Sequence, residues 1–132
     1  MPTLHGVTYR DLRPWKRELL VLYRIKLPEL MWQDGRGFET DYLYLGAREL
    51  VIKEWYAWDD ASGPTWDTDS TLRASLIHDA CYQLIRLGVL SRSAKSAVDR
   101  WFHDLLLEDG MNRLRAWYWL KGVQWFGRPW ED

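Results

Sequence analysis

Residues 70–88 read STLRASLIHDACYQLIRLG, the stretch in which the chain changes from strands to helices. Its apolar residues recur at the three- and four-residue spacing of an amphipathic helix. Asp69 or Ser70 is the expected N-cap, and Gly88 stands where a helix ends. The stretch therefore predicts a helix that runs to about Leu87.

Two more helices are predicted after this one. Their apolar stripes cover residues 94–107 and 112–124, with Gly110 between them and a Gly-Arg-Pro tail that ends the last helix. Before residue 59 the chain is rich in Val, Ile, Tyr and Leu, which indicates strands at 17–27, 37–45 and 49–58. The fold class predicted is α+β, with a small N-terminal antiparallel sheet of about three strands and a three-helix C-terminal half.

The length of 132 residues suits one domain. We divide it into a strand-rich half at 1–58, an acidic Gly-Pro loop at 59–69 and a helical half at 70–132. The net charge is -1, which argues against nucleic acid as a partner, and the single cysteine excludes a disulfide framework. No signal peptide and no transmembrane helix are recognised, so any membrane contact is expected to be peripheral.

The predicted helices carry a sparse polar constellation. His78 and Asp79 are followed one turn later by Tyr82, and Asp99 lies in the next helix. If the two helices are antiparallel, His78 and Asp99 meet at a similar depth. A buried carboxylate that accepts from one imidazole nitrogen fixes the tautomer and leaves the other nitrogen to activate water. The same residues equally suit a buried cluster that pins two helices together.

Oxygen ligands are plentiful beside this pair. Asp79, and Asp59 at the start of the acidic loop, are of the type that calcium prefers, although the loop does not match EF-hand spacing. Calcium is the one cofactor that these residues suggest. Against catalysis, His103-Asp104 repeats the dipeptide, and no nucleophile-elbow, P-loop or Rossmann motif is present.

From about residue 55 to 130 the chain resembles the phage and prophage family catalogued as domain of unknown function 1353. The resemblance is carried by YAWDDASGPT at 56–65, RASLIHDACY at 73–82 and DRWF at 99–102. The chain departs from the family pattern at Asp60, where Gly is usual, and at Val98, where Ala is common. The resemblance implies a phage or prophage origin and a location in the host cytoplasm or virion, and it implies no activity.

A shorter stretch is similar to phospholipase A2, whose His and distant Asp form a water-activating dyad. Carried over by residue, His78 is the base, Asp99 orients it and Tyr82 supports Asp99. Asp79 is then a calcium ligand. The loop around Gly63 stands in for the calcium loop, although it lacks the fuller glycine pattern of that family.

Ten tryptophans are the compositional outlier. Residues 111–130 combine four of them with four basic residues and no acidic one, a mixture that suits a protein interface or an anionic membrane surface. A packed terminal helix is the simpler interpretation.

Two functions follow from the sequence. The first is an accessory or virion-associated phage protein that binds a phage or host protein through its Trp-rich C-terminal segment, with a structural His-Asp cluster. The second is a calcium-dependent, phospholipase A2-like hydrolase of lipid or envelope esters. The sequence favours the first, because no complete catalytic motif is present.

Overall fold

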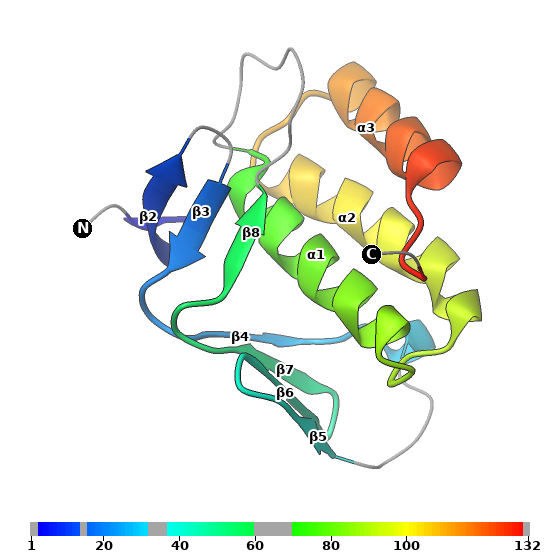
Figure 1. Cartoon of the computed structure of the whole chain (residues 1–132). Helices are drawn as coiled ribbons and strands as arrows, with labels where there is room; N and C mark the ends of the chain where they lie inside the picture. The colour runs from blue at the N-terminus through cyan, green and yellow to red at the C-terminus, as the bar shows by residue number, and fades with distance from the viewer. Residues whose placement is uncertain (1–2, 14–15, 32–36, 60–69, 131–132) are drawn as a thin grey trace.

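The computed structural model describes residues 3–13, 16–31, 37–59 and 70–130. These residues form two antiparallel sheets of four strands each and three α-helices (Figure 1). The fold is therefore α+β, as predicted, with the helices following the strands along the chain.

The first sheet has the strand order β1-β2-β3-β8. Its strands are β1 (Thr3–Leu4), β2 (Val7–Arg13), β3 (Lys16–Leu19) and β8 (Ala57–Asp59). The second sheet has the order β4-β7-β6-β5. Its strands are β4 (Tyr23–Lys26), β7 (Glu49–Ile52), β6 (Leu43–Gly46) and β5 (Phe38–Glu39). The chain thus leaves the first sheet after β3 and returns to it only at β8.

The prediction of about three strands was too coarse. Each predicted strand is two short strands, and β1 and β2 were not predicted. The runs at 17–27 and 49–58 break where the chain passes between sheets, and the run at 37–45 is a hairpin. Trp55 takes a φ of 73° in the turn between β7 and β8. Val21 and Leu22, between β3 and β4, and Trp55, between β7 and β8, are exposed although they are apolar, so hydrophobicity does not mark either break.

The helices lie close to their predicted bounds. They are α1 (Leu72–Arg86), α2 (Lys95–Glu108) and α3 (Arg113–Phe126), with short 3₁₀ turns at Glu29–Met31 and Arg92–Ala94. Gly88 takes the left-handed φ of 79° that favours glycine after a helix. The predicted N-cap of α1 was wrong, since Thr71 occupies that position without a side-chain cap. Asp69 lies outside the described residues.

The helices stack in order beside the sheets. Helix α1 packs against β8 and α2, and α3 packs on the far side of α2, away from both sheets (Figure 1). The buried Trp58 of β8 donates from Nε1 to Ser75 Oγ of α1 at 3.1 Å. This contact joins β8 to the first turn of α1, about one turn before His78.

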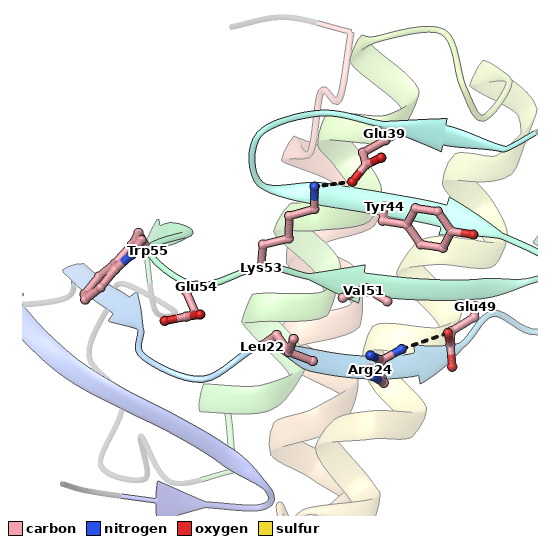
Figure 2. A pocket seen from close by; sticks show the side chains of 9 residues that line it. All are labelled: Leu22, Arg24, Glu39, Tyr44, Glu49, Val51, Lys53, Glu54 and Trp55. Atoms are coloured by element: carbon pink, nitrogen blue, oxygen red, sulfur yellow. Dashed lines mark hydrogen bonds and ion pairs between the residues drawn. The ribbon is translucent and has the colours of Figure 1, made fainter.

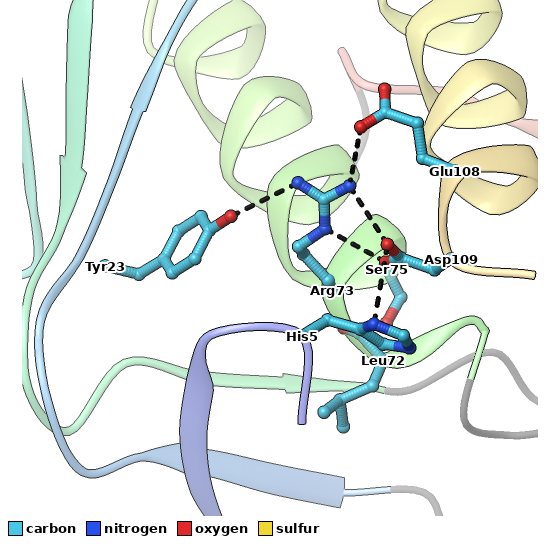
Figure 3. Close-up of polar contacts among 7 residues, drawn as sticks. All are labelled: His5, Tyr23, Leu72, Arg73, Ser75, Glu108 and Asp109. Atoms are coloured by element: carbon cyan, nitrogen blue, oxygen red, sulfur yellow. Dashed lines mark hydrogen bonds and ion pairs between the residues drawn. The ribbon is translucent and has the colours of Figure 1, made fainter. Parts of the chain in front are cut away.

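A second polar contact holds the start of α1. Arg73 donates to both carboxylate oxygens of Asp109 at 2.9 and 3.1 Å, and to Glu108 and Tyr23 as well (Figure 3). His5 Nδ1 lies 3.7 Å from the same aspartate. The Arg73 cluster therefore joins α1 to the end of α2, to β4 and to the β1–β2 turn. Within the described chain, no helix has the length and apolar character needed to cross a bilayer.

Candidate functional site

The site is built around Asp99, which is fully buried on α2. His78 Nε2 lies 2.9 Å from Oδ1, and the Tyr82 hydroxyl donates to the same oxygen at 2.6 Å. Lys95 Nζ donates to Oδ2 at 2.6 Å. Burial raises the pKa of Asp99, but the hydrogen bonds from His78, Lys95 and Tyr82 outweigh it and leave the pKa below its usual value. Asp99 is therefore a carboxylate at neutral pH.

The ionised Asp99 decides the tautomer of His78. A carboxylate only accepts, so the proton of the neutral imidazole sits on Nε2 and the lone pair on Nδ1. Among the described residues, none hydrogen-bonds Nδ1. The ring is held between Tyr82 and Phe102, with centroids 4.1 and 4.7 Å away, and the side chain is 10% exposed. His78 is thus oriented and largely enclosed while keeping a basic nitrogen.

The end of α3 closes this site on one side. Lys95 Nζ also donates to the carbonyls of Val123 and Gln124 at 3.0 and 3.3 Å, so all three of its protons have acceptors. Gly127 follows α3, and a Cβ built there would lie 2.3 Å from the Tyr82 hydroxyl. Lys95 and Tyr82 donate to Asp99 together with His78. The last turn of α3 therefore contacts the first of them, and Gly127 contacts the second.

Asp79 lies next to His78 on α1, facing the end of β8. Burial is the largest cause of a pKa raised to about 6, and the Asp59 carboxylate adds to the rise. His78, the backbone N–H of Asp59 and Lys16 act in the opposite direction. A carboxyl group with so perturbed a pKa, beside an oriented imidazole, is typical of a functional site.

The donor chemistry at Asp79 and Asp59 fits a hard cation such as calcium, which prefers carboxylate and carbonyl oxygens. Asp59 is exposed and lies 3.4 Å from Lys16. In the part of the chain that the structure describes, no group of three or more His, Cys, Asp or Glu side chains converges on one point. Gly63 lies outside the described residues. The described chain therefore offers two ligands of the right type.

The structure joins His78 and Asp99, as the antiparallel helix geometry predicts, and adds the Tyr82 contact that the phospholipase A2 resemblance implies. Sequence reasoning missed Lys95, although its spacing four residues before Asp99 on one helix is a recognisable ion-pair signal. The repeated dipeptide is different: His103 Nδ1 contacts the exposed Asp104 at 3.5 Å. That pair provides a matched control for the site.

A separate groove lies on the outer face of the second sheet, with the helices behind it (Figure 2). Its volume is about 570 Å³, and Trp55, Tyr44 and Val51 are among its lining residues. Four of its five charged side chains pair with one another, Arg24 with Glu49 at 3.2 Å and Lys53 with Glu39 at 2.5 Å. None of its lining residues belongs to the His78 cluster, so the groove is separate from the candidate site.

No family model matches the chain, and no curated protein or solved structure matches it either.

Proposed function

We propose that this protein is a hydrolase of lipid or envelope esters in which His78 activates the attacking water. The observation that carries the proposal is the 2.9 Å contact between His78 Nε2 and a carboxylate that Tyr82 and Lys95 hold ionised. Such an arrangement orients a general base. A cluster that only stabilises the fold does not require His78 Nδ1 to remain without a hydrogen bond from the described residues.

The chemistry follows from the tautomer. Nδ1 of His78 takes a proton from water as the water oxygen bonds to the ester carbonyl carbon. Asp99 stabilises the resulting imidazolium, which then returns the proton to the departing alkoxide as the carbon–oxygen bond breaks. The products are one carboxylic acid and one alcohol. Tyr82 and Lys95 position Asp99 and touch no reacting atom.

Calcium is the proposed cofactor, held by Asp79 with Asp59 and with Gly63 of the acidic loop. When bound, it would polarise the ester carbonyl and stabilise the negative charge that develops on its oxygen. Burial disfavours the ionised form of the Asp79 carboxyl, and a bound cation would stabilise that form.

A phage or prophage origin is part of the proposal. The WD segment at 58–59, the HD dipeptide at 78–79 and Asp99 carry the resemblance to the phage family, and in the fold they lie together. The host cytoplasm or the virion is then the expected location. One second candidate is favoured by the exposed aromatic side chains of α3, among them Trp117 and Trp125. It is a non-catalytic accessory or virion-associated protein whose His-Asp cluster is structural.

The test is hydrolysis of a soluble short-chain ester in calcium and in chelator, by wild type, His78→Ala and His103→Ala. We expect His78→Ala to lose roughly a hundredfold or more of the activity, with the same secondary structure by circular dichroism. His103→Ala removes the other histidine of a His-Asp dipeptide and should keep full activity. A wild type without activity, or an equally active His78→Ala, would refute the hydrolase and favour the second candidate.

Calcium binding is tested separately by isothermal titration calorimetry on wild type and Asp79→Asn. Binding to wild type that Asp79→Asn loses would support the cation site. Equal binding by both proteins, or none at millimolar calcium, would contradict it.

A further inference from the structure

Helix α3 is apolar on two opposite sides. Its inner side, with Ala116 and Leu120, is buried against α2. Its outer side carries an exposed stripe at the spacing of successive turns, which we call the outer stripe: Leu114, Trp117, Tyr118, Trp125 and Phe126. Trp125 is 65% exposed and Phe126 78% exposed. A contiguous exposed apolar stripe on a folded protein typically marks an interaction surface, so the outer stripe indicates a partner.

The stretch of sequence that contains the outer stripe carries only basic charges. Between residues 111 and 130 the chain has four basic residues and no acidic one, whereas the whole chain has a net charge of -1. The four are Arg113, Arg115, Lys121 and Arg128. Lys121 lies 5.8 Å from the Trp117 ring, within the stripe itself. Exposed indoles and a phenol with Lys121 among them, and with Arg113 and Arg128 exposed nearby in the sequence, match the interfacial layer of an anionic bilayer.

We propose that the outer stripe of α3 is a membrane-binding face for anionic phospholipid. This inference deepens the proposed hydrolase and rests on it for one consequence, that the ester cleaved is a lipid of the bound surface. Binding itself depends on α3 alone. An acidic protein surface and a second copy of this chain are the alternatives that the test separates.

The same helix connects this face to the candidate site. Trp125 and Phe126 directly follow Val123 and Gln124, whose carbonyls accept from Lys95. Lys95 in turn donates to Asp99. Gly127 then lies against Tyr82, where a Cβ would not fit. A bilayer that takes up Trp125 and Phe126 therefore holds the polar network of the site close to its interface.

The test is co-sedimentation with vesicles of phosphatidylcholine alone and with about one quarter phosphatidylglycerol. The variants are Trp125→Ser with Phe126→Ser, Lys121→Glu, and Trp55→Ser as the matched control. Trp55 is 53% exposed in the groove of the second sheet, so its loss changes exposed indole without touching α3.

We expect wild type and Trp55→Ser to bind the anionic vesicles, with binding that weakens as salt is raised. The double variant should bind at least tenfold less. Lys121→Glu should bind the anionic vesicles at least about fivefold less tightly than wild type, since each basic residue near the surface contributes about 1 kcal/mol. Equal binding to both vesicle types, or by the double variant, would overturn the proposal.

A concentration-dependent dimer in light scattering that the double variant abolishes, without vesicle binding, would overturn it in favour of a second copy. A result that refutes the proposed hydrolase can be told apart from one that refutes the membrane-binding face. His78→Ala should bind vesicles like wild type whether or not the protein is an enzyme. Cleavage of the soluble ester without vesicle binding would refute the membrane face alone.

Discussion

Replacing Asp79 by Asn should stabilise the protein at neutral pH in the absence of calcium. The folded state raises the pKa of this carboxyl from 3.8 to about 6, chiefly through burial. The folded protein therefore binds the proton more tightly than the unfolded chain does. Stability from this group is fully present below pH 3.8, and it is lost as the pH rises through 6. Asn is neutral at every pH and can still accept from the backbone N–H of Asp59.

The size of the effect follows from the shift. About two pKa units at 1.36 kcal/mol each give an upper limit of about 3 kcal/mol at pH 7.5. At pH 4.5 most of the folded carboxyl is already protonated, and the same relation leaves about 1 kcal/mol. We expect the free energy of unfolding of Asp79→Asn to exceed that of wild type by about 1–3 kcal/mol at pH 7.5, and by roughly a third of that at pH 4.5.

Urea denaturation followed by tryptophan fluorescence, in chelator at both pH values, measures this difference. Asp104→Asn is the matched control, because this aspartate also follows a histidine in mid-helix but is exposed. Its effect should stay within about 0.5 kcal/mol at both pH values. A destabilised Asp79→Asn at pH 7.5, or a gain that does not shrink in acid, would refute the reasoning. Added calcium should stabilise wild type and leave Asp79→Asn unchanged.

Three further predictions concern stability and reactivity. Arg73→Met should lower the free energy of unfolding by about 3 kcal/mol, because it leaves the buried Asp109 carboxylate with only His5, 3.7 Å away, beside it, and Arg73→Lys should recover only part of the loss; urea titration measures both. Gly127→Ala should cost about 1–3 kcal/mol, since the new methyl meets the Tyr82 hydroxyl, whereas Gly122→Ala, with open space around it, should not destabilise. Thermal melts of the two alanine variants decide this, and equal melting temperatures would contradict it. Cys81 is buried, and burial raises its thiol pKa to about 12, so it should react with a thiol reagent only in denaturant; rapid labelling of the native protein would be the opposite result.

Local sequence was sufficient for the helices. Their apolar spacing and the glycines at 88 and 110 act within one or two turns, so the bounds of α1, α2 and α3 could be predicted closely. It was also sufficient to bring His78 and Asp99 together, because residues at equal distances from the turn between two antiparallel helices lie at a similar depth, whereas the contact of Tyr82 with Asp99 was implied by the phospholipase A2 resemblance.

Tertiary structure decided the rest. In the described part of the chain, eight short strands in two sheets replaced three longer ones, because the sequence stays apolar through each crossing between sheets even where Val21, Leu22 and Trp55 are exposed. The contact of Lys95 with the end of α3, and the close approach of Gly127 to Tyr82, depend on how α3 packs across α2, a choice that no short stretch of sequence encodes. The same packing determined which tryptophans enter the core and which form the outer stripe, since α3 is apolar on both sides and its sequence alone does not say which side is covered.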